Sequence, residues 1–270
     1  MKPSPPHASP ADDPMRHLLE IMRRLRDPEG GCPWDRQQDF RSLVPYTLEE
    51  AYEVADAIER GAFDELCGEL GDLLFQVVFH AQLAAEQGRF GFEDVARSIA
   101  DKLVRRHPHV FADARVADAE QQTLDWERRK AAEREARSGG RAGVLHDIPQ
   151  ALPALTRAAK LQRRLARAVP EADRPQQPLL EASLDALRRA LGEGGGPAAG
   201  AALGELLFHA AGLARQQGLD PEHLLREANR DFEQRVEGLE ARLAAEGRRL
   251  EDAGADALAA LWVRDGDGAA

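Results

Sequence analysis

Residues 66–78 read LCGELGDLLFQVV, and this stretch decides the fold class. Its apolar residues recur three or four positions apart, which is the spacing of one face of an α-helix. They are Leu66, Leu70, Leu73, Leu74, Val77 and Val78. A half-buried strand would alternate strictly, and no run of alternating β-branched residues in the sequence is long enough to predict one. We therefore expect an all-α protein.

The composition of the 270-residue chain agrees with this expectation. Ala, Leu, Glu and Arg dominate, and all four are strong helix formers. Hydrophobic residues make up 43% and charged residues 31%, which is typical of a globular chain and not of a disordered one. The net charge of −11 argues against binding to nucleic acid, because non-specific binding needs a basic face.

The ends of the chain and its cysteines indicate where the protein works. No apolar run approaches the roughly 20 residues that span a bilayer, so we expect no membrane segment. Residues 1–14 are proline-rich without the apolar core of a signal peptide, which predicts a disordered tail. Cys32 and Cys67 are too few for a disulfide framework or a cysteine-rich metal site. We expect a reduced, cytoplasmic protein.

Helix caps and breakers divide the chain into a series of expected helices. In the first half they cover about 15–26, 37–43, 45–60, 64–85, 93–106 and 118–137. In the second half they cover about 152–168, 179–191, 201–217 and 221–246, with a short last helix that ends near 262. The glycine-rich segment that begins at Ser138 is the best candidate for a linker between the halves.

The two halves are similar in sequence. ELGDLLF at 69–75 recurs as ALGELLF at 202–208, and Trp126 aligns with Trp262. A duplicated helical domain is the simplest explanation, and chance similarity between two leucine-rich helices is the alternative. The duplication predicts two tandem, related helical-bundle domains with defined limits. These are a tail at 1–14, a first domain at 15–137, a linker at 138–147, a second domain at 148–263 and a tail at 264–270.

Four carboxylates have helical spacing. Glu50 and Glu53 are three residues apart on one expected helix, and Glu69 and Asp72 repeat that spacing on the next. Antiparallel packing of the two helices across a turn at Gly61 would bring all four together. Carboxylates that lie side by side stay ionised only if cations neutralise them. Oxygen ligands favour Mg²⁺, or Mn²⁺ in its place, over Zn²⁺.

These acidic pairs also have a simpler interpretation. A chain with 47 Asp and Glu residues carries many such pairs on solvated helix faces, and one pair alone indicates nothing more. Glu69 and Asp72 interrupt an otherwise apolar run, however, which would turn them towards the protein or a partner helix. This setting favours a metal site.

Basic residues at helical spacing form a second candidate group. They are Lys102, Arg105 and Arg106, with Lys130 four residues after Trp126 on another expected helix. A basic cluster alone is usually a solvated face. Opposite a cluster of carboxylates and metal, however, such cations suit a polyphosphate, because arginine makes bidentate contacts with phosphate. Carboxylates, metal and cations together are typical of phosphoryl transfer.

Four motifs in the chain resemble the MazG family of nucleoside triphosphate pyrophosphohydrolases. They are GCPWD at 31–35, YTLEEAYE at 46–53, GELGDLLF at 68–75 and RRHPHVF at 105–111. The resemblance extends from about Met15 to Trp262, and it is specific in the first half and loose in the second. It implies the all-α NTP pyrophosphatase fold, and a homodimer or higher homo-oligomer that completes the site.

The resemblance also implies a reaction and a role for each matched residue. The family hydrolyses NTPs and dNTPs to a monophosphate and pyrophosphate, by attack of water on the α-phosphorus. The implied Mg²⁺ ligands are Glu50, Glu53, Glu69 and Asp72. The implied phosphate ligands are Lys102, Arg105, Arg106 and Lys130. The implied nucleoside contacts are Trp126, Trp34 and Gln38, although both tryptophans are equally compatible with core aromatics. Glu49 is implied as a general base or as a residue that orients a ligand.

The second half departs from the family pattern. Ala202 stands in place of Glu69 and Glu205 in place of Asp72, and Gln234 replaces Arg105. We therefore expect the second domain to be catalytically inactive, with a structural or regulatory role. Two other functions remain open for the chain: a non-catalytic helical scaffold, and a metal-binding carboxylate bundle of the di-iron type. The di-iron type usually contains ExxH motifs, which are absent here.

Overall fold

The computed structural model describes residues 13–112, 129, 133 and 143–263, and within them every regular element is a helix. The all-α prediction is therefore confirmed. Contacts divide the chain into a first unit, residues 1–131, and a second unit, residues 132–270. Among the described helices, none combines the length and the apolar character needed to cross a membrane. The predicted limits of the domains and of the linker at 138–147 stay predictions.

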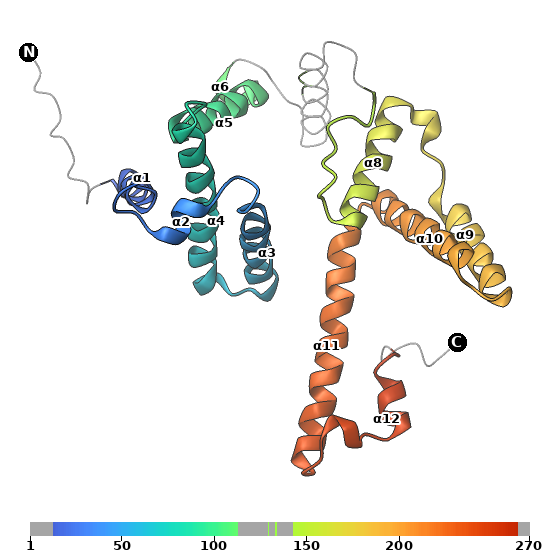
Figure 1. Cartoon of the computed structure of the whole chain (residues 1–270). Helices are drawn as coiled ribbons and strands as arrows, with labels where there is room; N and C mark the ends of the chain where they lie inside the picture. The colour runs from blue at the N-terminus through green and yellow to red at the C-terminus, as the bar shows by residue number, and fades with distance from the viewer. Residues whose placement is uncertain (1–12, 113–128, 130–132, 134–142, 264–270) are drawn as a thin grey trace, which may run out of the picture. The chain divides into compact units, whose positions relative to one another are not determined.

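The first unit consists of six described helices, coloured blue to green in Figure 1. They are α1 (Pro14–Leu25), α2 (Pro33–Gln37), α3 (Val44–Arg60), α4 (Phe63–Glu86), α5 (Phe92–Arg106) and α6 (Pro108–Phe111). The short helix expected over 37–43 is wrong, because α2 ends at Gln37 and a turn follows. In that turn the Asp39 carboxylate accepts hydrogen bonds from the backbone N–H groups of Arg41 and Ser42 at 2.7 and 2.8 Å. Such side-chain bonds compete with helix formation.

The helices α3 and α4 form an antiparallel hairpin (Figure 1). Gly61 ends α3 in the left-handed region at φ 70°, which glycine adopts without a steric cost, and its N–H bonds the carbonyls of Ala57 and Ile58. Only Ala62 then separates Gly61 from the start of α4. This short connection makes the two helices run side by side, as the predicted meeting of the carboxylates requires.

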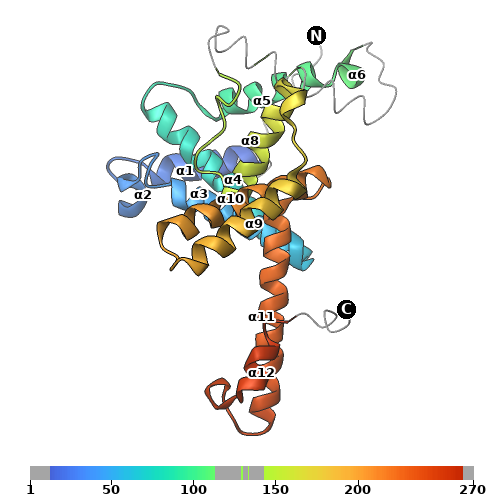
Figure 2. The same cartoon turned by 90° about the vertical axis from the view of Figure 1, so that its right-hand side faces the viewer.

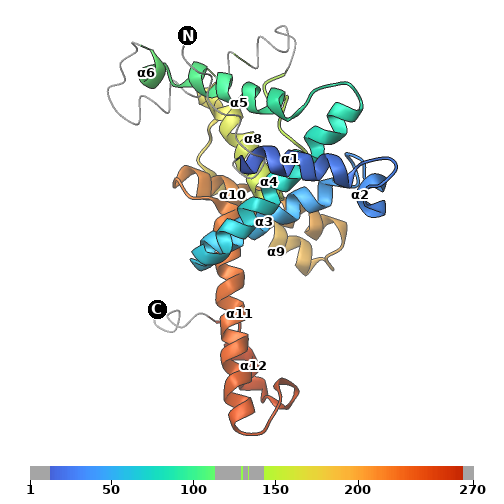
Figure 3. The ribbon, with the colours of Figure 1, turned by 90° about the vertical axis from the view of Figure 1, so that its left-hand side faces the viewer.

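The apolar core of the first unit lies where α1 crosses the second half of α4 (Figure 3). Its large, fully buried side chains are Met22, Leu43, Val78 and Phe79. Burial of each such side chain contributes roughly 1.5–3 kcal/mol. Arg26, which follows α1, binds the Glu86 carboxylate at the end of α4 at 2.6 and 2.7 Å, and its guanidinium also donates to the Asp35 and Gln38 carbonyls. This arginine fixes the loop that leads from α1 into the hairpin.

The second unit repeats this order of one helix, a hairpin and a further helix. Its helices are α8 (Ala154–Ala168), α9 (Gln176–Gly192), α10 (Pro197–Gln216), α11 (Pro221–Ala245) and α12 (Ala255–Ala260), with 3₁₀ turns at Pro170–Ala172 and Leu250–Asp252. The hairpin consists of α9 and α10. Figure 2 shows α12 beside the end of the long helix α11, where Leu239, Leu243 and Leu261 are buried together.

Amide side chains occupy the centre of the second unit. Gln176 is 7% exposed, its Oε1 lies 2.9 Å from His209 Nδ1, and its Nε2 donates to the Arg174 carbonyl at 2.9 Å. Gln162 donates to the Phe208 carbonyl at 2.8 Å. Both amides press against Gly212 of α10, where a Cβ would lie 2.3 Å from Gln162 Oε1 and 2.7 Å from Gln176 Oε1. A side chain at this position would therefore require both amides to shift.

Candidate metal centre

The hairpin α3–α4 brings the predicted carboxylates together. Oxygen atoms of Glu50 on α3 and of Glu69 and Asp72 on α4 all lie within 4.8 Å of one another. Glu53, one turn after Glu50, is close enough to hydrogen-bond with both Glu50 and Glu69. Glu50 and Glu69 are half-buried and Asp72 is exposed, so the cluster lies at the edge of the helix seam and is open to solvent on one side.

Burial and neighbouring negative charges raise the pKa of two carboxylates in this cluster. Burial, followed by the charges of Asp72 and Glu53, raises the pKa of Glu50. Burial, followed by the charges of Glu53 and Asp72, raises the pKa of Glu69. Among the described residues, no basic side chain contributes to either pKa shift. A divalent cation would relieve this repulsion, and a set of oxygen donors alone fits Mg²⁺ or Mn²⁺. The donor chemistry of the cluster therefore fits a hard divalent ion.

Glu49 lies beside the cluster on α3. Its side chain is exposed, and its charge adds to the causes that raise the pKa of Glu50. This position is compatible with either role that the resemblance implies, as a base or as an orienting group.

Three of the four predicted phosphate ligands lie on another helix of the first unit. Lys102, Arg105 and Arg106 are in the last turns of α5, whereas α5 meets α4 through its first residues, near Ala81 and Ala85. Within the described ranges no ion pair joins any of these three cations to Glu50, Glu69 or Asp72. Trp126 and Lys130 lie outside the described residues.

The two predicted nucleoside contacts near α2 differ in their surroundings. Trp34 is 47% exposed and packs edge-on against Tyr46 at a centroid distance of 5.7 Å, so it is not a core residue. Tyr46 is one turn before Glu50 on α3, which places this aromatic pair along the hairpin from the carboxylates. The Gln38 side chain is engaged within the loop, because its Nε2 donates to the Trp34 carbonyl and its Oε1 accepts from Ser42 Oγ.

The sequence did not single out Gln76 as a site residue. Gln76 follows Asp72 by one turn of α4, is 5% exposed, and its Oε1 is buried with no hydrogen-bond partner among the protein atoms of the described residues. The next residue in this row, His80, stacks on Phe40 and lies 3.0 Å from Thr47 Oγ1, and burial lowers its pKa. The spacing of four between Asp72, Gln76 and His80 was the available signal.

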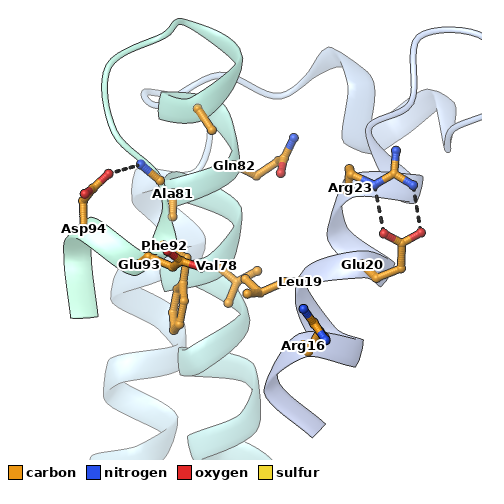
Figure 4. A pocket seen from close by; sticks show the side chains of 12 residues that line it. Arg16, Leu19, Glu20, Arg23, Val78, Ala81, Gln82, Phe92, Glu93 and Asp94 are labelled. Atoms are coloured by element: carbon orange, nitrogen blue, oxygen red, sulfur yellow. Dashed lines mark hydrogen bonds and ion pairs between the residues drawn. The ribbon is translucent and has the colours of Figure 1, made fainter. Parts of the chain in front are cut away.

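A separate open pocket of about 440 Å³ lies between α1, α4 and the start of α5 (Figure 4). Leu19, Val78 and Phe92 form its apolar wall. Charged groups on its rim are engaged locally: Arg23 pairs with Glu20 at 2.8 Å, and Asp94 accepts a hydrogen bond from the Gly91 N–H at 3.0 Å. The pocket is on the second half of α4, away from the carboxylates, and is not part of the candidate metal centre.

Comparisons with known proteins agree with the motifs of the first unit. The profile of the MazG nucleotide pyrophosphohydrolase domain matches residues 38–111, a range that contains the carboxylate cluster. A nucleoside triphosphate pyrophosphohydrolase from Escherichia coli K12 is 44% identical over 252 residues, which are 91% of this chain and 94% of that protein. The nucleoside triphosphate pyrophosphohydrolase/pyrophosphatase MazG of Thermotoga maritima is 37% identical over 92% of this chain and 93% of its own length.

Proposed function

The chain belongs to the MazG family of nucleotide pyrophosphohydrolases and is a hydrolase, and from this premise we propose its reaction. It converts nucleoside triphosphates (NTP and dNTP) to monophosphate and pyrophosphate. The reaction depends on Mg²⁺ and takes place in the first unit. The observation that carries this proposal is the meeting of three carboxylates within 4.8 Å across the α3–α4 seam. Mutual repulsion in this cluster favours a divalent cation, and the triphosphate of a nucleotide needs one.

In the proposed reaction Glu50, Glu53, Glu69 and Asp72 hold the ion. When bound, Mg²⁺ supplies Lewis-acid chemistry, because it neutralises charge on the phosphates and acidifies water. Water adds to the α-phosphorus, the bond from this phosphorus to the bridging oxygen breaks, and pyrophosphate leaves. Glu49 accepts the proton of the water or orients it. Lys102, Arg105, Arg106 and Lys130 bind the phosphates, while Trp34, Trp126 and Gln38 contact the nucleoside.

The separation of cations from carboxylates supports a site that two copies of the chain complete. Among the described helices, α5 makes its main contacts with α4 and α6 and not with α3, and the hairpin keeps apolar side chains exposed, among them Leu48 at 43%, Tyr52 at 50% and Leu70 at 50%. An uncovered apolar face of this kind is typical of a symmetric interface. Mixing Asp72→Ala chains with the impaired Arg105→Ala chains would then raise activity above that of either variant alone, if the two groups come from different copies. No recovery after mixing and re-equilibration would contradict a shared site.

The second unit has a structural or regulatory role in this proposal. Ala202 and Glu205 stand where the first unit has Glu69 and Asp72, and no cluster of metal-ligand type is found among its described residues. Activity of a variant with an intact first unit should therefore not depend on any acidic residue of α10.

Product analysis tests the proposal directly. Incubation of the full chain with each common NTP or dNTP and Mg²⁺ should yield monophosphate and pyrophosphate in equal amounts, and chelation of the metal should stop the reaction. Release of orthophosphate alone, or no turnover of any substrate, would contradict it and favour the non-catalytic scaffold. Iron in the purified protein would instead favour a di-iron carboxylate bundle.

A further inference from the structure

Gln76 is a buried polar residue without a protein partner for its acceptor atom. It is 5% exposed, and no protein atom of the described chain donates to its Oε1. Native proteins satisfy most buried polar atoms, because an unsatisfied acceptor loses its bonds to water and gains nothing in return. A residue of this kind indicates a donor that comes from outside the chain.

Two contacts across the α3–α4 seam define where Gln76 faces. Asp72, one turn earlier on α4, meets Glu50 of α3. His80, one turn later on α4, meets Thr47 of α3 at 3.0 Å. Gln76 shares their face of α4 and therefore lies against α3 between the levels of Glu50 and Thr47. Exposure falls along this row, from Asp72, which is exposed, to Gln76, which is buried. Gln76 is thus the next residue of this row inward from the carboxylate cluster.

The second unit offers a comparison within the same chain. His209 stands four residues after Glu205, as Gln76 stands four residues after Asp72. There the side chain has protein partners, since His209 Nδ1 lies 2.9 Å from Gln176 Oε1 and Nε2 lies 3.5 Å from Glu205. In the second unit, which lacks the full set of carboxylates, the side chain at this position has protein partners. In the first unit, which has all four carboxylates, the acceptor atom at this position has none among the described residues. At this position, therefore, the open acceptor accompanies the carboxylate cluster, although the second unit has another buried acceptor without a partner among the described residues, Gln162 Oε1 on α8.

We propose that Gln76 is a positioning residue whose Oε1 accepts a hydrogen bond from the hydration water of the divalent cation at the carboxylate cluster, an inference that rests on the proposed function for the presence of the cation. Hydrated Mg²⁺ and Mn²⁺ keep several waters, and these donate to acceptors around the site. A neutral amide oxygen serves this role without adding another negative charge beside Glu50 and Asp72. Groups that hold the outer partners of a metal site set its affinity as well as its chemistry.

Titration of the full chain with Mn²⁺ tests the role of Gln76 without any turnover. Free Mn²⁺ is measured by its electron paramagnetic resonance signal, for wild type, Gln76→Leu and Gln76→Met. We expect both variants to bind Mn²⁺ about 10-fold more weakly, because outer partners of metal sites contribute this much to affinity. Their metal-free melting temperatures should be equal to or above that of wild type, because an unsatisfied buried acceptor is removed.

The matched control is Gln82→Leu on the same helix. The Gln82 amide donates a hydrogen bond of 3.0 Å to the Glu86 carboxylate, at a distance from the carboxylate cluster of several helical turns. This variant should bind Mn²⁺ as wild type does. Equal Mn²⁺ affinity in wild type and in the folded Gln76 variants would overturn this inference and leave the proposed function intact. No Mn²⁺ binding by wild type would overturn the carboxylate site itself, and the inference with it. A fall in affinity confined to the Gln76 variants supports the assignment.

Discussion

The two hairpins of the molecule share a backbone plan and differ in what faces the seam. α3 and α9 each have 17 residues, and α4 and α10 follow them with 24 and 20 residues. The seam of α3–α4 carries clustered carboxylates and the open acceptor of Gln76. The corresponding positions of α10 carry Ala202, Glu205 and His209, whose ring is engaged by Gln176. The helix pair is thus the repeated scaffold, and the seam side chains are what distinguish its two copies.

The buried side chains that pack against the two hairpins also differ, being apolar in the first unit and partly polar in the second. Phe79 of α4 is fully buried among apolar side chains. The aligned residue of α10 is Gly212, and the amides of Gln162 and Gln176 occupy the space beside it. At this position the second unit therefore has hydrogen-bonded glutamine side chains where the first unit has apolar packing. A domain can tolerate this exchange if its role requires a stable shape and no catalytic cluster.

The largest expected difference between the hairpins is in catalysis. Asp72→Ala removes a proposed metal ligand and should lower turnover by about 10³-fold or more, since several kcal/mol of charge stabilisation depend on the ion. Glu205→Ala, the matched change in the second unit, should leave turnover unchanged. Pyrophosphate release at saturating Mg²⁺ measures both, and circular dichroism checks that each variant is folded. A comparable loss in Glu205→Ala would break the contrast between the two hairpins.

The next contrast concerns the helices that follow the hairpins. Arg105→Ala in α5 should lower kcat/KM by about 10–100-fold, because a charge-assisted hydrogen bond to phosphate contributes roughly 1.5–3 kcal/mol. Gln234, the aligned residue in α11, should be replaceable by Ala without effect. Steady-state kinetics with a common NTP separates the two variants. If Arg105→Ala behaves like Gln234→Ala, the phosphate role of the end of α5 is wrong.

Local sequence patterns were sufficient for the fold class and for the meeting of the carboxylates. A spacing of three residues places Glu69 and Asp72 on one helix face, and Gly61 marks the reversal between α3 and α4. Both signals depend only on neighbouring residues. The turn at 38–43 was mispredicted for the same reason, because the Asp39 side chain bonds the backbone and overrides a weak helical pattern.

Features that depend on the register between helices could not be predicted from the sequence. The burial of Gln76 depends on which residues of α3 lie opposite it, and no local pattern carries that register. The requirement for glycine at 212 depends on Gln162 of α8 and Gln176 of α9, which are distant in sequence. Arg105 belongs with the carboxylates by its chemistry, but α5 makes its main contacts with α4 and α6 and not with α3.

The glutamine side chains beside Gly212, those of Gln162 and Gln176, give a smaller prediction that concerns stability alone. Gly212→Ala should destabilise the protein by about 1–3 kcal/mol, because the new methyl group overpacks against hydrogen-bonded amides. Gly204→Ala on the same helix is the matched control, since a Cβ there meets nothing within 4 Å. It should stabilise by about 0.5–1 kcal/mol, as alanine generally does in a helix interior. Urea unfolding measures both, and a stabilising Gly212→Ala would show that the amides rearrange freely.

The smallest contrast concerns two ion pairs, each with an arginine side chain only 9% exposed. Arg26 holds the pKa of Glu86 below its usual value in the first unit, and Arg215 holds the pKa of Asp173 below its usual value in the second. A lowered pKa means that the pair stabilises the fold above the unfolded-state pKa and that this contribution is lost as pH falls through the folded-state pKa. At pH 7, Glu86→Gln and Asp173→Asn should each cost about 1 kcal/mol, because the carboxylates are partly exposed and screened.

Urea unfolding of each variant at pH 7 and at successively lower pH values measures the loss of these ion pairs. The difference between wild type and each variant should close as pH falls below the usual pKa values of 4.5 for Glu86 and 3.8 for Asp173. Asp56→Asn, which breaks an exposed pair with Arg60 within α3, is the control, and it should cost less stability than either of the other two variants. If the Glu86→Gln deficit persists undiminished in acid, the cost comes from a disturbed loop between α1 and the hairpin and not from the ion pair. In that case Arg26 stabilises the first unit through its hydrogen bonds to the Asp35 and Gln38 carbonyls, which do not depend on the charge of Glu86.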